Sequence, residues 1–113
     1  MTKMRWEDVQ AIIKSPNNKN DVYLLFFTLE DDQMCKIMRN NIYQVEEYFS
    51  KRNDFHIIEI DAKESNLYLE PNTKYQVLEV PTFCIMKNNH INNIGHNFYP
   101  KEILMDWILE LLD

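Results

Sequence analysis

The sequence "LLFFTLEDDQMCKIM", residues 24–38, contains the change of pattern that decides the fold. Its first residues belong to an unbroken apolar and aromatic run, "DVYLLFFTL" at 21–29. A run without alternation is typical of a strand buried on both faces, as in the middle of a parallel or mixed sheet. From Asp32 to about Arg52 the apolar residues instead recur every three or four positions, as on one face of a helix: Cys35, Met38, Ile42, Val45 and Phe49. The stretch therefore predicts a central strand that leads directly into a long helix.

The acidic run "EDD" at 30–32 lies where that helix begins. The short carboxylate side chains of Asp31 and Asp32 can accept hydrogen bonds from the free main-chain N–H groups of the first turn. Their negative charge also favours the positive end of the helix dipole. The run has oxygen ligands for a cation as well, but helix capping explains it without a metal, so we expect capping.

Strand and helix patterns continue to alternate outside this stretch. A helix is predicted at 6–13, strands at 55–63 and 80–87, and a hairpin over 82–95. Pro71 suits the first turn of a short helix over about 71–77. A last helix follows Pro100, and its predicted buried stripe contains Ile103, Leu104, Trp107, Ile108 and Leu111. This order predicts one α/β domain over residues 1–113, with a central mixed sheet of about four strands flanked by helices on both faces.

Composition and charge argue against several classes of partner. The formal net charge is −6, whereas nucleic acids and anionic membranes reward patches of lysine and arginine. There is no apolar run of about 18 residues to cross a membrane. The first residues, "MTKMRWEDVQ", lack the apolar core of a secretory signal. We therefore expect a cytoplasmic protein that binds neither nucleic acid nor membrane.

Cysteine and histidine provide few candidates for a metal or cofactor site. Cys35 and Cys84 are too few for a disulfide framework, and each fits the pattern of a buried thiol. His90 and His96 flank the second strand of the hairpin without a third ligand nearby, and we expect them to be exposed. Neither a metal nor a cofactor is expected.

Asparagine is abundant in the predicted turns, whereas Gly95 is the only glycine. The stretches "SPNNKN" at 15–20 and "KNNHINN" at 87–93 show this bias. Asparagine tolerates the left-handed backbone conformation better than most residues. We therefore expect asparagine to take the turn positions that glycine takes in other proteins.

Several motifs in the same order resemble the thioredoxin family over almost the whole chain. "LLFFTLEDDQMCKIM" is similar to the strand and redox helix of that family, where the usual motif is Trp-Cys-Gly-Pro-Cys-Lys. "IIEIDAKE" at 57–64 resembles the following strand, and "KYQVLEVPTFCIMKNNHI" at 74–91 matches the family's Pro-Thr strand and the turn after it. The resemblance implies a thioredoxin-like fold that lacks most of the first strand. It also implies a cis peptide bond at Val80-Pro81, facing the start of the redox helix.

The first position of the redox motif departs from the family pattern. Alignment on Cys35 places Asp32 where the family has its nucleophilic cysteine, with Gln33 and Met34 in place of Gly-Pro and Asp31 in place of tryptophan. Disulfide exchange needs an attacking thiolate, and an aspartate cannot form a mixed disulfide. The departure therefore implies that the usual dithiol–disulfide cycle is absent.

The residues that support this chemistry in the family are also replaced. The buried acid that assists proton transfer falls on Phe26, and the lysine of the next strand falls on Ile57. Both positions are apolar in this chain. The resemblance therefore implies a motif, D-x-x-C, that has lost its titratable pair as well as its nucleophile.

Cys35 leaves two interpretations open. It lies on the apolar stripe of the helix, as a packing residue does. The helix N-terminus lowers the pKa of a thiol, whereas Asp32 one turn earlier opposes a second negative charge. A single-cysteine thiol redox enzyme using Cys35 as its catalytic residue is the alternative. A peroxiredoxin-like activity would further need a nearby arginine, for which Arg39 is the candidate.

The leading hypothesis is a redox-inactive thioredoxin-like module that binds a protein or an extended peptide. Spliceosomal thioredoxin-like proteins also have a D-x-x-C stretch and act as binding modules. Main-chain groups beside a cis-proline can pair with an extended peptide without any cysteine. The expected groove contains Leu29, Glu30, Asp31, Val80, Pro81, Thr82 and Gly95.

Overall fold

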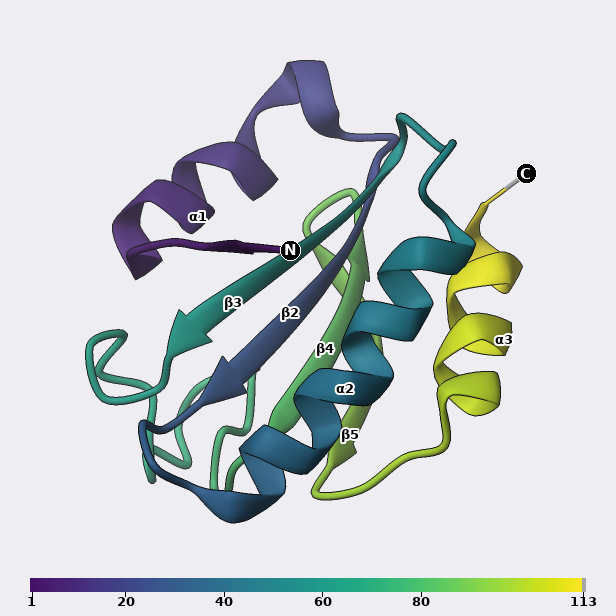
Figure 1. Cartoon of the computed structure of the whole chain (residues 1–113). Coiled ribbons are helices and arrows are strands. Elements are labelled where there is room, and N and C mark those ends of the chain that lie inside the picture. The colour runs from purple at the N-terminus through teal and green to yellow at the C-terminus, as the bar shows by residue number, and fades with distance from the viewer. Residues whose placement is uncertain (113) are drawn as a thin grey trace.

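β2 (Val22–Thr28) lies in the middle of a mixed five-stranded sheet, as the unbroken apolar run predicts (Figure 1). The structure is a computed structural model that describes residues 1–112. In the strand order β1-β3-β2-β4-β5, the first three strands are parallel, and β4 and β5 are antiparallel to their neighbours. The other elements are β1 (Thr2–Lys3), α1 (Trp6–Lys14), a 3-10 helix at Pro16–Asn18, α2 (Gln33–Tyr48), β3 (Phe55–Asp61), β4 (Thr82–Lys87), β5 (His90–His96) and α3 (Lys101–Leu111).

The predicted α/β class and the mixed sheet are confirmed, with five strands in place of about four. The additional strand, β1, has two residues, which pair with Ile58 and Glu59 of β3. Two residues are too few to show a periodic pattern. The sequence therefore predicted the four longer strands and missed the short one.

Alternate side chains of β2 enter two separate cores, one on each face of the sheet. Tyr23, Leu25 and Phe27 pack with residues of α1 in one core. Val22, Leu24 and Phe26 pack with residues of α2 and α3 in the other. All seven residues of the strand are buried, which explains why its sequence shows no alternation.

The two long helices agree with their predicted stripes except at one position. All five predicted residues of the α2 stripe are buried, although the helix ends at Tyr48, earlier than expected. In α3, Leu104 and Ile108 are buried, whereas Ile103 is exposed and was wrongly placed in the stripe. Adjacent helix positions are about 100° apart, so Ile103 points away when Leu104 faces the core.

The predicted short helix over 71–77 is wrong. The described chain from 62 to 81 consists of turns and bends without a helix. Gln76 has a φ of 52°, outside the helical region, and its side-chain amide donates to the carbonyls of Pro71 and Thr73. The N–H of Leu69 also donates to the carbonyl of Val77 at 2.9 Å, which closes the segment as a loop.

Asparagine takes four of the seven left-handed positions of non-glycine residues, as predicted, although none of them lies in the stretch at 15–20. Asn88 and Asn89 form the β4–β5 turn with φ values of 54° and 59°. This is the two-residue hairpin turn that asparagine and glycine favour. The full set of non-glycine residues with positive φ is Asp31, Asn66, Leu69, Gln76, Asn88, Asn89 and Asn97.

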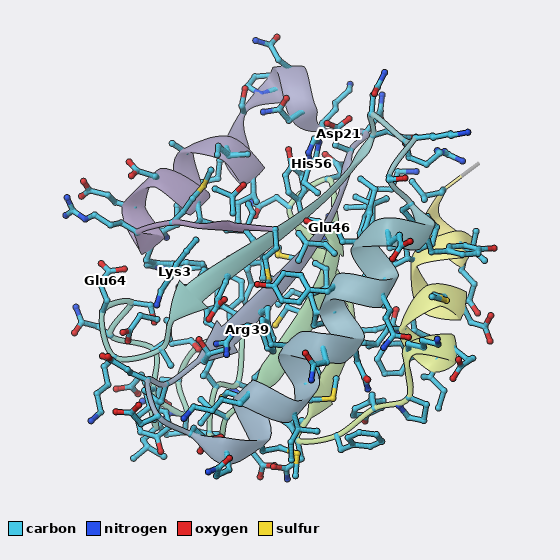
Figure 2. All side chains as sticks on the ribbon, viewed as in Figure 1. Lys3, Asp21, Arg39, Glu46, His56 and Glu64 are labelled. Carbon is cyan, nitrogen blue, oxygen red and sulfur yellow. The ribbon has the colours of Figure 1, made fainter. Side chains whose placement is uncertain are left out.

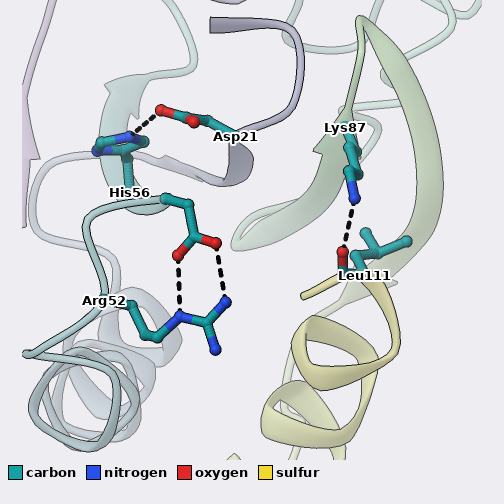
Figure 3. Close-up of polar contacts among 6 residues, drawn as sticks. Asp21, Arg52, His56, Lys87 and Leu111 are labelled. Atoms are coloured by element: carbon teal, nitrogen blue, oxygen red, sulfur yellow. Dashed lines mark hydrogen bonds and ion pairs between the residues drawn. The ribbon is translucent and has the colours of Figure 1, made fainter. Parts of the chain in front are cut away.

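Three polar contacts lie at the end of the sheet opposite to the start of α2 (Figure 3). His56 Nε2 lies 2.7 Å from Asp21 Oδ2, and Arg52 forms a bidentate pair with Asp54. Lys87 Nζ donates to the carbonyl of Leu111 at 2.8 Å. This last bond satisfies a carbonyl at the C-terminus of α3 with a positive charge, the favourable sign for that helix end.

Gly95 is required for space rather than for backbone freedom. It lies within β5 opposite Phe83, and its φ is not positive. A Cβ atom at this position would lie 2.8 Å from Cε1 of the Tyr99 ring. That ring is itself packed edge-on against Phe83 and tilted against Trp107. Gly95 therefore makes room for Tyr99.

We expect Gly95→Ala to lower the free energy of unfolding by about 1–3 kcal/mol, because the added methyl group overpacks the site. Urea unfolding monitored by circular dichroism measures this change. The control is a double-mutant cycle with Tyr99→Ala, in which the penalty of Gly95→Ala should largely disappear. An equal penalty in both backgrounds would show that the ring is not the cause.

Candidate functional site

Three segments meet at the end of the sheet where α2 begins (Figure 1). Residues 29–32 follow β2, residues 79–81 precede β4, and residues 97–99 follow β5. Phe27 pairs with Thr82, and Thr82 pairs with His96, so these segments leave neighbouring strands at the same level. The fold thus brings together every segment of the predicted groove.

Asp32 is the N-cap of α2, as predicted. Its Oδ1 accepts a hydrogen bond from the N–H of Cys35 at 2.9 Å. Asp31 before it adopts a left-handed φ of 64° that turns the chain into the helix. The carboxylate of Asp32 therefore occupies the helix start one turn before the thiol of Cys35.

Cys35 is buried, and its thiol is a weak acid. Burial is the main cause that raises the pKa of Cys35 to about 11, and the hydrogen bond and negative charge of Asp32 add to it. A main-chain hydrogen bond from Leu29 and the charge of Arg39 act in the opposite direction without overcoming these causes. At pH 7 the thiolate fraction at this pKa is roughly 10⁻⁴.

Cys84 is buried in the same core as Cys35. Its Sγ lies 3.7 Å from the carbonyl of Tyr75, and burial raises its pKa to about 12. Both thiols are free. Cys84 is therefore a core residue, as its place in the strand predicted.

A buried ion pair that the sequence did not predict joins α2 to the sheet. Glu59 of β3 accepts hydrogen bonds from Arg39 Nη2 at 2.7 Å and Arg39 Nε at 3.3 Å, and from the hydroxyl of Thr28 at 2.7 Å. Figure 2 shows Arg39 between α2 and the sheet. Burial favours protonation of Glu59, but the bonds from Arg39 and Thr28 outweigh it and lower the pKa of the carboxyl.

This ion pair lines a small cavity beside the start of α2. The cavity has a volume of about 190 Å³, and its wall also contains Lys3, Lys36, Thr28, Leu29, Glu30 and Asp31. Lys36 Nζ lies 4.0 Å from Asp31. The charges of the wall are thus largely paired with each other.

The loop before β4 is held in place by residues at the end of β5. The Val80-Pro81 peptide bond is cis, and the carbonyl of Pro81 accepts from the N–H of Asn97 at 2.9 Å. The side chain of Asn97 donates to the carboxylate of Glu79. These two bonds join Glu79 and Pro81 to the residue that follows β5.

Thr82 links the same loop to His96. Its hydroxyl donates to the carbonyl of Glu79 at 2.6 Å and lies 3.0 Å from Nδ1 of His96. A hydroxyl has one proton to donate, so His96 Nδ1 is the donor in the second bond. His96 is half-buried at the end of β5 and bonded to the loop. The expectation that His96 is an exposed turn residue is therefore wrong.

The main chain of Val80 stands unpaired beside the cis-proline. Its side chain belongs to the core, yet neither its N–H nor its C=O has a hydrogen-bond partner within residues 1–112. Gly95, by contrast, is buried within β5, and Asn97 rather than Gly95 contacts the loop.

Four residues of the site were not predicted from the sequence, because no local motif marks them: Glu59, Glu79, His96 and Asn97.

The helices of the described chain are too short or too polar to cross a bilayer. Among residues 1–112, no group of three His, Cys, Asp or Glu side chains is placed to hold a metal ion.

We expect Arg39→Ala to lower the free energy of unfolding by about 3 kcal/mol, because it leaves the buried carboxylate of Glu59 without its counter-charge. The loss should be present near pH 7. It should shrink as the pH falls through the lowered pKa of Glu59, below the unfolded value of about 4.3, since protonation removes the ion pair. Urea unfolding across pH measures both effects.

The matched control for this prediction is the double variant Arg39→Met/Glu59→Leu. It replaces the ion pair with apolar side chains and should recover most of the lost stability. Unchanged stability of Arg39→Ala at neutral pH would contradict a structural role for the pair.

Comparison with known proteins identifies similar sequences and structures. No profile of a known protein family matches the chain. A thioredoxin of Mycoplasmopsis pulmonis is 29% identical over 112 residues, which cover 98% of each chain. The germline-specific thioredoxin Deadhead of Drosophila melanogaster has a TM-score of 0.76 and 18% identity, covering 99% of this chain and 100% of its own. Mitochondrial thioredoxin 3 of Saccharomyces cerevisiae has a TM-score of 0.74 and 19% identity, covering 97% and 94%.

The two structural similarities establish the fold, and the sequence similarity extends over both whole chains apart from a few residues. The predicted thioredoxin-like fold is therefore confirmed. The chain thus has a thioredoxin fold, and its sequence is similar to that of a thioredoxin over almost its whole length.

Proposed function

We propose that this chain binds an extended peptide or protein segment at the cis-proline groove and does not catalyse dithiol–disulfide exchange. The observation that carries the proposal is the start of α2. Asp32 caps the helix where a nucleophilic thiol would be needed, and Cys35 is buried with a pKa raised to about 11. Exchange requires one thiol to attack as a thiolate and a second to resolve the mixed disulfide. Neither requirement is met at this helix start.

The Arg39–Glu59 pair supports the same conclusion. A proton relay to a thiol needs a group that gains and loses its proton near the working pH. Glu59 accepts three hydrogen bonds and its pKa is lowered, so it stays ionised at neutral pH. Glu59 therefore holds the helix to the sheet and does not act as a proton relay for Cys35.

Peptide binding is supported by the loop beside Pro81. The unpaired N–H and C=O of Val80 form a donor and acceptor pair of the kind that an added strand uses. The bonds from Asn97, His96 and Thr82 fix this loop in advance. A partner therefore meets a site that is already formed, which lowers the entropy cost of binding.

The first test concerns the thiol chemistry. In an insulin-reduction assay with dithiothreitol, the protein should give no acceleration above its Cys35→Ser variant. A thiol-reactive dye should label Cys35 slowly at pH 7 and faster as the pH approaches about 11. Fast labelling of the native protein at pH 7 would instead favour a single-cysteine redox enzyme and defeat the proposal.

The matched variant is Asp32→Cys in a Cys84→Ala background. The introduced thiol lies one turn before Cys35 and should form a disulfide with it under oxidising conditions. Mass spectrometry after alkylation detects that bond. If no disulfide forms, the geometry of the helix start differs from the one on which the proposal depends.

The second test concerns peptide binding. Cysteine-free decapeptides should bind, since the proposed contacts use the main chain and no thiol. Amide hydrogen exchange followed by NMR should show that the N–H of Val80 exchanges readily in the free protein and becomes protected in the complex. The N–H of Asn97, already bonded to Pro81, is the internal reference. Binding that leaves Val80 unprotected would place the peptide elsewhere.

A further inference from the structure

The two sides of the groove carry the same sign of charge. Glu30 and Asp31 are exposed on the segment after β2, and Asp32 beside them is partly exposed. Glu79 is exposed on the opposite side, directly before Val80. The pairing of Phe27 with Thr82 keeps these two sides on neighbouring strands. A segment lying along Val80 would therefore pass between carboxylates.

Few cations are available to balance these carboxylates. Lys36 lies 4.0 Å from Asp31, and Arg39 is occupied by Glu59. Lys3 lines the same cavity as Glu30 and Asp31, on the side of β1, away from Glu79. Lys63 follows β3, which lies on the far side of β2 from the loop that contains Val80. Lys101 donates to the side chain of Gln44 on α2. The groove thus retains a negative charge, which is part of the net charge of −6 of the whole chain.

Exposed apolar side chains flank the same place. Leu78 is 43% exposed, two residues before Val80, and Phe98 is 51% exposed, directly after Asn97. Ile37 is 49% exposed on the first half of α2, one turn before Asn41, which donates to the carbonyl of Tyr99. Leu78 and Phe98 belong to the two segments that the bond from Asn97 to Pro81 joins, and the bond from Asn41 to Tyr99 ties the helix of Ile37 to the second of them. A partner can therefore bury an apolar side chain here while its flanking residues meet the carboxylates.

We infer that the groove selects an extended segment in which lysine or arginine residues flank an apolar residue. This inference rests on the proposed function and names the chemical class of its partner. Main-chain pairing with Val80 supplies affinity for any extended segment. The apolar residue contacts Leu78, Phe98 and Ile37, and the basic residues meet Glu30 and Glu79. Opposite charges at the rim raise the association rate and discriminate against acidic segments.

The experiment compares three cysteine-free peptides of one length with the same central leucine. Their flanking residues are lysine and arginine, serine and asparagine, or glutamate and aspartate. Fluorescence anisotropy at low salt should give a dissociation constant about tenfold lower for the basic peptide than for the neutral one, and the weakest binding for the acidic one. The difference should narrow at about 0.2 M salt, because screening weakens exposed charges.

A charge-reversal pair assigns the preference to the groove. Glu30→Lys/Glu79→Lys should reverse the order of the basic and acidic peptides. The matched control, Glu47→Lys/Glu110→Lys, changes the net charge equally at exposed positions near the C-terminal ends of α2 and α3 and should keep the order. Glu79 accepts a bond from Asn97, so Glu30→Gln/Glu79→Gln provides a milder variant that keeps this bond and should abolish the preference.

The outcomes separate the inference from the function on which it rests. Equal affinity for the basic and neutral peptides would overturn the inference and leave peptide binding intact. Loss of the preference in the control pair would also overturn it, because the whole-molecule charge would then be the cause. Failure of all three peptides to bind would overturn the proposed function itself.

Discussion

The complete burial of β2 is the constraint on which the rest of the structure depends. Seven consecutive buried residues need a layer of side chains on each face and a hydrogen-bonded strand on each edge. α1 supplies one layer, α2 and α3 supply the other, and β3 and β4 pair with the two edges. Because β2 ends beside the start of β4, its burial also sets Asp32 and Cys35 close to the cis-proline loop.

The Arg39–Glu59 ion pair places two charges beside the start of α2 in a structural role. Positions 26 and 57 are apolar, and the sequence alone therefore indicated that the titratable pair was lost. Glu59 pairs directly with Phe26 across the strands, so its carboxylate lies on the same face of the sheet, with Arg39 above the Phe26 ring. A carboxylate held by a bidentate arginine and a hydroxyl is a structural anion. The pair thus fixes α2 on the sheet and leaves Cys35 a weak acid.

How far the sequence predicts this structure depends on the range of the interactions involved. The four longer strands, the stripe of α2, the cap at Asp32 and the asparagine turn between β4 and β5 follow from local patterns, and all are present. The bond from the N–H of Trp6 to the side chain of Glu64 caps α1. It joins residues 58 positions apart, so no local sequence pattern indicates it. Similarly, the loop at 71–77 is shaped by side-chain bonds of Gln76 that compete with a helix. The pairing of β4 with β5 brings three further residues to the site, and their roles cannot be predicted without that pairing: Glu79, His96 and Asn97.

One substitution at the helix start accounts for both halves of the proposed function. A carboxylate at position 32 caps α2 as serine or asparagine would, and its charge also interacts favourably with the helix dipole. That charge raises the pKa of Cys35, which opposes thiol chemistry, and it extends the negative side of the groove formed by Glu30 and Asp31. With a neutral capping side chain at position 32, the pKa of Cys35 would be lower, and the groove would discriminate less in favour of basic segments. In the proposed function, the carboxylate of Asp32 therefore both opposes thiol chemistry at Cys35 and adds negative charge to the binding groove.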